Sequence, residues 1–470
     1  MSQRILANLG FLLQIAGLLV VVPIGIGFYY NETQELIPLL MTCIAFLGCG
    51  FLLNAICERK DLDFKSSSVL LLAAFIILPL IGAIPYMYSD PFGSLNILDR
   101  FTNSYFESVS GFTTTGFSFI TNTDALPRSM LVFRSLTELM GGIGVVFLIL
   151  AFFQSKRSIK NLGNALGVDN LNGNLRKMFF LVFAVYGVYI AVFTGIFYFL
   201  GFNNLLSTST FVIDTITGGF QPSAPQFQQY LFLGPEILII VLMLLGSVNF
   251  VFNYHLFTGK IKKMFSAEIL LFAAIILAAT GAVVYYANIG FVDSLFHVVS
   301  MSSTTGLDYL GIATLNNTAV TIFITLIIVG GCTFSMAGGI KISRLLTFGK
   351  SIGQAVKMTF VKAESTEEEY SETTKSFYEF FPALISILLF IAVLIVFAML
   401  FTTMGVSFTN AIFEVGSALS TNGVSMGATT VAMPIAYKWL MIGAMTIGRV
   451  EILTILIALI PVSIKRLETK

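Results

Sequence analysis

Ten mostly apolar stretches divide this chain from one end to the other. A helix needs roughly 20 such residues to cross the hydrocarbon of a bilayer, so each stretch predicts a membrane span. Only 11% of the 470 residues are charged, whereas a soluble protein carries about 25%. The chain is therefore expected to lie mostly in lipid. With soft boundaries, the stretches cover residues 5–30, 37–57, 68–88, 129–153, 178–200, 234–257, 267–288, 319–346, 377–402 and 436–463.

Lysine and arginine gather in every second connection between these stretches. The connections 31–36, 89–128, 201–233, 289–318 and 403–435 hold only Arg100 and Arg128. Because basic loops stay on the cytoplasmic side, the other connections and both termini are predicted to be cytoplasmic. That side holds Arg4, Arg59, Lys60, Lys65, Lys156, Arg157, Lys160, Arg176, Lys177, Lys260, Lys262, Lys263, Lys341, Arg344, Lys350, Lys357, Lys362, Lys375, Lys465, Arg466 and Lys470.

Four of the outer connections carry one short pattern, Thr-x-Gly followed by an apolar residue. The four segments are 113–117, 216–220, 303–307 and 420–424. Upstream, the register persists in three copies, where Phe106, Phe296 and Phe413 align, and the second copy diverges. A repeat of this kind predicts one structural unit used four times. The predicted unit is a span, a short re-entrant helix, a Thr-x-Gly strand and a second span.

This pattern suits a cation that has lost its water. Non-helical backbone at membrane depth is tolerated where it lines a cavity, and four extended strands around an axis offer rings of oxygen ligands. Glycine allows the backbone angles that turn successive carbonyls the same way. The alternative interpretation is that Thr and Gly simply form loops outside the membrane. The candidate ligands are Thr114, Thr115, Gly116, Thr217, Gly218, Gly219, Thr304, Thr305, Gly306, Thr421, Asn422 and Gly423.

Together with these strands, three further motifs make the chain resemble the TrkH/KtrB superfamily of bacterial and archaeal K⁺ transporters. They are GGIG at 141–144, GGCTFSMAGGIKISR at 330–344 and GRVEI at 448–452. The resemblance implies an all-α polytopic membrane protein in which two N-terminal helices precede four pseudo-fourfold M1–pore helix–M2 repeats around a central pore. The implied units are residues 1–65, 66–158, 159–265, 266–375 and 376–470.

The same resemblance implies how such a pore is controlled. Residues 330–339 correspond to an intramembrane gating loop, and their glycines would break a helix in any case. Arg449 matches an arginine in the pore pathway, with pairing to Glu451 as the alternative. The expected gating residues are Gly330, Gly331, Cys332, Thr333, Ser335, Gly338, Gly339 and Arg449.

The resemblance also implies that K⁺ is transported, that the protein lies in a bacterial or archaeal cell membrane and that it forms a homodimer. It further implies a cytoplasmic TrkA-like ring that binds nucleotide. A carrier that couples K⁺, or mixed K⁺ and Na⁺, to Na⁺ or H⁺ is the rival hypothesis. The four repeats run parallel, which argues against an inverted-repeat carrier but not against ion coupling in the pore. No P-loop, zinc-protease or hydrolase motif occurs, so the chain is not expected to be an enzyme.

Several charged residues remain open to two interpretations. Arg134 and Glu138 are spaced to pair on one helix face. Glu107, Glu414 and Asp214 precede the strands and either brace them or raise the cation concentration at the mouth. His297 replaces the equivalent acid in the third copy and is expected to be a packing residue.

Overall fold

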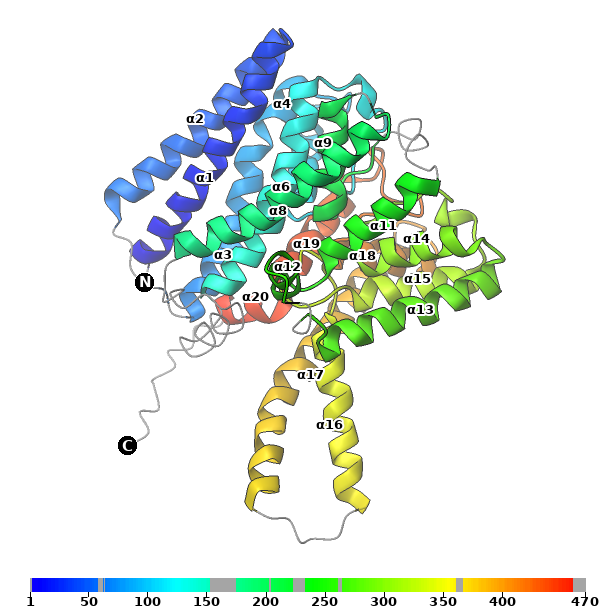
Figure 1. The fold of residues 1–470 in the computed structure, drawn as a ribbon. Helices are drawn as coiled ribbons and strands as arrows, with labels where there is room; N and C mark the ends of the chain where they lie inside the picture. Colours follow the sequence, from blue (N-terminus) through cyan, green and yellow to red (C-terminus); the bar gives the residue numbers. More distant parts are fainter. Residues whose placement is uncertain are drawn as a thin grey trace.

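The computed structural model describes residues 2–57, 62, 64–152, 175–202, 204–222, 233–260, 264–360 and 367–459, and these are almost entirely helical outside the loops. Two antiparallel N-terminal helices, α1 (Ser2–Tyr29) and α2 (Thr33–Ile56), lie along one side of the molecule (Figure 1). Glycines allow their close approach, since a β-carbon at Gly10 would lie 2.9 Å from the carbonyl oxygen of Gly50. This pair packs against the first repeat through α3 and α6.

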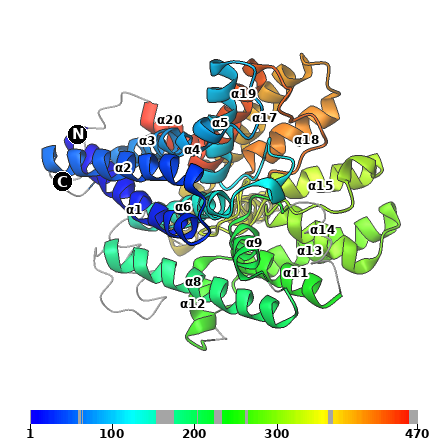
Figure 2. The ribbon, with the colours of Figure 1, turned by 90° about the horizontal axis from the view of Figure 1, so that it is seen from above.

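Four repeats follow, each with a short helix held between two longer elements. Seen from above, they surround a common centre (Figure 2). The short pore helices are α5 (Ile97–Phe112), α9 (Leu205–Thr217), α14 (Phe291–Ser302) and α18 (Phe408–Leu419). They are flanked in turn by α3 (Phe64–Gly82), α4 (Ile84–Ser89) and α6 (Arg128–Phe152); α8 (Leu175–Phe199), α11 (Leu233–Ser247) and α12 (Phe250–Phe257); α13 (Ala267–Ala287) and α15 (Asn317–Val329); and α17 (Glu367–Thr402), α19 (Ile435–Val450) and α20 (Ile452–Leu459). The predicted fold class is confirmed.

The predicted spans appear as helices, but not all of them are straight. Six helices in the described residues are long and apolar enough to cross a membrane, or eight if each of two bent pairs counts as one span. The two predicted spans outside this set, 129–153 and 319–346, form α6 and α15. The bends, 115° between α11 and α12 and 93° between α19 and α20, were not predicted. The first bend coincides with Asn249, whose side chain accepts a hydrogen bond from the Val251 amide and starts α12.

The third repeat differs from the other three after its pore helix. Its second span ends at Val329, as its glycines predict, and a non-helical segment leads to α16 (Ile342–Phe360). Together α16 and the N-terminal part of the long α17 project from the helical body as a hairpin (Figure 1). The sequence analysis did not predict this hairpin. The basic cluster Lys156, Arg157 and Lys160, the first repeat boundary at 158 and the terminal Lys465, Arg466 and Lys470 lie outside the described residues.

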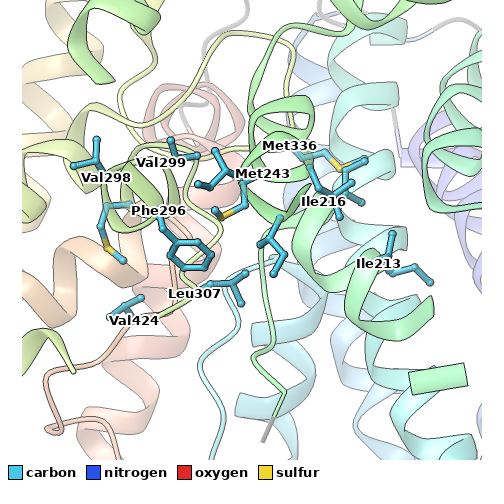
Figure 3. Close-up of a cluster of buried hydrophobic side chains, with 14 of the residues drawn as sticks. Ile213, Ile216, Met243, Phe296, Val298, Val299, Leu307, Met336 and Val424 are labelled. Carbon is cyan, nitrogen blue, oxygen red and sulfur yellow. The ribbon is translucent and has the colours of Figure 1, made fainter. Parts of the chain in front are cut away.

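Apolar side chains around the strands form the core that positions the pore helices. Phe296 and Val299 of α14 lie near Met243 of α11 and Leu307 of the third strand (Figure 3). Phe296, Val299 and Met243 have no exposed surface, and Leu307 is only 1% exposed. At the packing density of protein interiors, such a cluster resists displacement, so the strands rest on a rigid scaffold.

Candidate functional site

The four Thr-x-Gly segments meet one another around a closed ring. The evidence is the close approach of a glycine in each segment to the backbone of the next one. A β-carbon on Gly116 would lie 2.3 Å from the Gly219 carbonyl, and one on Gly218 would lie 2.8 Å from the Thr304 carbonyl. A β-carbon on Gly306 would lie 1.8 Å from the Asn422 carbonyl, and one on Gly423 would lie 1.9 Å from the Thr115 carbonyl. Each contact joins one repeat to the next, and the last returns to the first. No side chain larger than hydrogen fits without displacing a neighbouring strand.

The backbone of three segments alternates between left-handed and ordinary conformations. Gly116, Gly306 and Gly423 have φ of 76° to 82°. Two residues earlier, Thr114, Thr304 and Thr421 have φ of 51° to 55°. Positive φ is costly for a β-branched residue and is a marker of functional constraint. Such alternation allows successive carbonyl oxygens to face one side of a strand.

The second segment is one residue out of register with its sequence alignment. Gly246 approaches the Ile216 carbonyl just as Gly141 approaches that of Phe112 and Gly448 that of Leu419. Ile216 is therefore the counterpart of Phe112. Counting from it, left-handed Gly218 takes the place of Thr114, and Phe220 takes the place of Gly116.

A side-chain contact supports the same register. Thr217 Oγ1 donates to the Ile213 carbonyl at 2.8 Å, as Thr113 Oγ1 does to that of Val109 at 2.7 Å. The ring is thus less symmetric than the aligned motifs suggest, because the second repeat has phenylalanine where the other three have glycine.

Buried acidic side chains brace the chain just beyond the first and fourth strands. Glu107 accepts hydrogen bonds from Ser118 Oγ at 2.8 Å and from the Phe119 amide at 3.1 Å. Glu414 accepts from the Met426 and Ala428 amides at 2.8 and 3.1 Å. These acids were expected either to brace the strands or to raise the cation concentration at the mouth. The hydrogen bonds of Glu107 and Glu414 fit the bracing interpretation.

A residue outside the pore helices braces the second strand. Glu138 of α6 accepts a hydrogen bond from the Phe220 amide at 2.6 Å. It does not pair with Arg134, so that prediction was wrong. Arg134 instead binds Glu107 at 2.8 Å and lies 3.9 Å above the Phe220 ring. Asp214 lines a separate small cavity beside Arg134. Helical spacing alone did not reveal that each acid has a partner from another element.

The expected gating segment lies directly against the strands. The Gly338 amide donates to Thr304 Oγ1 at 2.8 Å, and a β-carbon at Gly338 would lie 2.0 Å from the Ser420 carbonyl. Left-handed Gly330 and Gly339 touch each other, which closes the segment into a compact loop. Amides of Cys332 and Met336 donate to the carbonyls of Ser247 and Gly246, so the loop is also tied to the second repeat.

The expected side chains of the gating segment hold it internally and to α16. Ser335 Oγ donates to the Cys332 carbonyl at 2.6 Å, and Thr333 hydrogen-bonds to Ser343. Gly331 packs against Ala337. The segment is therefore one folded loop rather than an extended linker.

Arg449 of α19 also binds the gating segment. Its guanidinium donates to the Met336 carbonyl at 2.7 Å and to the Gly141 carbonyl at 3.3 Å. The alternative pairing with Glu451 is not found, because Glu451 binds Arg344. Arg449 thus bridges the gating segment and the second span of the first repeat with a buried cation.

A cavity of about 340 Å³ lies immediately beyond the strands. Gly116 of the first strand and Gly423 of the fourth form part of its wall, together with Gln221 of the second repeat and Asp308 of the third. All four repeats therefore contribute to a hollow that leads to the ring.

Comparisons with known proteins agree with this architecture. Residues 264–464 match the TrkH family model, described as a cation transport protein. An uncharacterised cation transporter of Methanocaldococcus jannaschii is 27% identical over 97% of this chain and 94% of its own length. The Trk system potassium uptake protein TrkH of Escherichia coli K12 is 22% identical over 86% of this chain and 87% of its own. The crystal structure of the potassium transporter TrkH from Vibrio parahaemolyticus superposes with a TM-score of 0.80 at 20% identity, covering 98% of this chain and 99% of the other. This last match confirms the fold.

Proposed function

We propose that this chain, which is similar to Trk potassium uptake proteins and carries a match to the TrkH family model, moves K⁺ across a cell membrane through the ring formed by its four strands. The observation that carries the proposal is the closure of that ring, in which the glycines of successive repeats approach neighbouring backbone carbonyls. Carbonyl oxygens held in this way replace the hydration shell of a monovalent cation. The proposed ligands are the twelve predicted residues, with Phe220 adjoining them in the second strand.

The pore helices supply a second element of cation preference. Each of the four ends next to the strand that follows it. The C-terminal end of a helix carries roughly half a negative charge from its unpaired carbonyls. Four such ends around one ring favour a cation over an anion without a ring of carboxylates.

Residues 330–339 are proposed to gate the pore from the opposite side to the outer cavity. Their contacts with Thr304 and with the Ser420 carbonyl support this role, because the loop sits where an ion leaving the ring must pass. Arg449 is proposed to hold the loop closed through the Met336 carbonyl. Movement of the loop would break only a few hydrogen bonds of about 1 kcal/mol each.

Regulation is proposed to come from the cytoplasmic side. The family resemblance implies a TrkA-like ring that binds nucleotide, and the relatives belong to Trk systems. The projecting α16–α17 hairpin begins just after the gating segment, so a partner that moves the hairpin has a direct mechanical link to it. We also propose a homodimer with both termini on this side.

Uptake of ⁸⁶Rb⁺ into liposomes that hold the purified protein tests the proposal. Uptake at fixed voltage that K⁺ competes for, and that excess Na⁺ inhibits weakly, is expected. Absence of cation flux under every voltage and gradient would contradict the proposed function. A second arm adds a Na⁺ or H⁺ gradient at constant voltage, and uptake that requires either gradient would establish the coupled carrier instead.

A further inference from the structure

Three repeats use the same two positions to join the pore helix to the chain beyond its strand. One position lies nine residues before the filter glycine, and the other lies two residues after it. The pairs are Glu107 with Ser118 at 2.8 Å, Glu414 with Ser425 at 2.7 Å and His297 with Asp308 at 3.2 Å. In the third repeat the pore helix carries the histidine, and the carboxylate belongs to Asp308 in the chain beyond the strand.

This exchange places a negative charge in the outer cavity. Glu107 and Glu414 have no exposed surface, so their charges lie behind the strands. The Asp308 side chain is 14% exposed and forms part of the cavity wall with Gly116 and Gly423. Among the described residues that line this cavity, Asp308 alone carries a formal charge.

The carboxylate of Asp308 is fixed and ionised. The amides of Leu310, Gly311 and Ile312 donate to it at 3.0 to 3.1 Å. Burial acts to raise the pKa of Asp308, but the adjacent His297 and the hydrogen bonds from the Ile312 and Gly311 amides outweigh it and hold the pKa below its usual range. A rigid negative charge in a hollow with low-dielectric walls concentrates cations there.

His297 has two competing partners on one ring nitrogen. Its Nδ1 lies 2.8 Å from the Asp293 carbonyl, which only accepts, so Nδ1 carries a proton. Its Nε2 lies within reach of the Asp308 carboxylate, an acceptor, and of the Tyr309 amide at 3.4 Å, a donor. Through Nε2, His297 joins pore helix α14 to the chain beyond the third strand.

Other ionisable groups near His297 are held by Tyr309. The Tyr309 hydroxyl lies 2.7 Å from Asp293 Oδ1 and 2.8 Å from Glu236 Oε1. These two acids face His297 from α14 and α11, and Asp308 faces it from the strand. His297 therefore lies among three carboxylates, of which Asp308 is the one in the cavity wall.

We propose that Asp308 concentrates monovalent cations at the outer mouth of the filter. The inference rests on the proposed function, since it assigns a residue of cation entry to that pore. Asp308 is thus a residue that sets apparent cation affinity.

The test compares wild type with Asp308→Asn in ⁸⁶Rb⁺ uptake at low ionic strength. One unit charge about 7 Å from an ion in water changes its local concentration about threefold, so the Rb⁺ concentration for half-maximal uptake is expected to rise at least about threefold. High ionic strength should remove the difference, because salt screens exposed charges. Asp124→Asn, which removes an exposed acid next to the cavity wall but not in it, is the matched control and should behave as wild type.

A charge-moving double variant separates this role from folding. His297→Glu with Asp308→Ser rebuilds the pairing of the first and fourth repeats, so the strand stays braced while the cavity loses its charge. It should match Asp308→Asn in half-saturation.

The outcomes are distinguishable from failure of the proposed function. If wild type carries no cation, the pore itself is refuted. If wild type transports but Asp308→Asn and the double variant keep wild-type half-saturation at low ionic strength, the role of Asp308 is refuted.

Discussion

Adding one methyl group to the fourth strand should damage the filter far more than adding it elsewhere in the same repeat. Gly423 and Gly405 both have left-handed backbone, with φ of 82° and 88°. Alanine at either site carries a similar conformational cost of about 1 to 2 kcal/mol. The difference lies in the surroundings: a β-carbon at Gly423 would lie 1.9 Å from the Thr115 carbonyl oxygen, whereas one at Gly405 would meet nothing within 4 Å.

Gly423→Ala must therefore push the fourth strand from the first by about 1.5 Å to restore ordinary contact. A displacement of this size moves carbonyl oxygens away from an ion that has exchanged its water for them. Every 1.4 kcal/mol of lost ion stabilisation weakens binding about tenfold. We expect at least a tenfold loss of K⁺ over Na⁺ discrimination, or of flux, for Gly423→Ala.

The assay is ⁸⁶Rb⁺ uptake into liposomes with K⁺ or Na⁺ as competitor, with thermal unfolding measured in parallel. Gly405→Ala is expected to lose only the conformational cost of about 1 to 2 kcal/mol and to keep wild-type selectivity. Wild-type selectivity and flux in Gly423→Ala, with the protein folded, would refute the assignment of this glycine to the filter.

Three further substitutions test other contacts of the site. Arg449→Ala removes the hydrogen bonds to the Met336 and Gly141 carbonyls and should raise cation leak in the absence of any activating partner; unchanged or lower leak would contradict the holding role. Arg134→Ala leaves Glu107 buried without its partner and should lower stability by about 3 to 5 kcal/mol, measured by unfolding in detergent, whereas a loss below about 1 kcal/mol would show that the pair is not structural. Gly141→Ala places a β-carbon 1.9 Å from the Phe112 carbonyl and should impair flux, while Gly144→Ala, with nothing within 4 Å, should not; equal effects would remove the packing argument.

The sequence predicted the repeats because the physical demands on them are local. Span length, basic connections and the Thr-x-Gly pattern each depend on residues close in the chain. The break after Val329 also followed from local glycines. The bend at Glu451 did not, because it depends on a residue from another repeat: Glu451 binds Arg344 and has left-handed backbone.

The site was predicted less completely than the fold. The segment Ile216–Phe220 shares the Thr-x-Gly pattern of the other strands, but the approach of Gly246 to the Ile216 carbonyl sets a register one residue away. The partners of Arg134 and Glu138 likewise come from pore helix and strand rather than from their own helix. Contacts between distant segments decide these details, and periodicity in one chain does not encode them.

The most direct test of the account is to locate the ions. Crystals grown in Rb⁺ or Tl⁺ salts give anomalous density that marks monovalent cations individually. We expect anomalous peaks on the axis enclosed by Gly116, Gly218, Gly306 and Gly423, each surrounded by backbone oxygens of more than one repeat. Well-ordered strands with no cation density between them, in crystals where the ion is bound elsewhere, would contradict it.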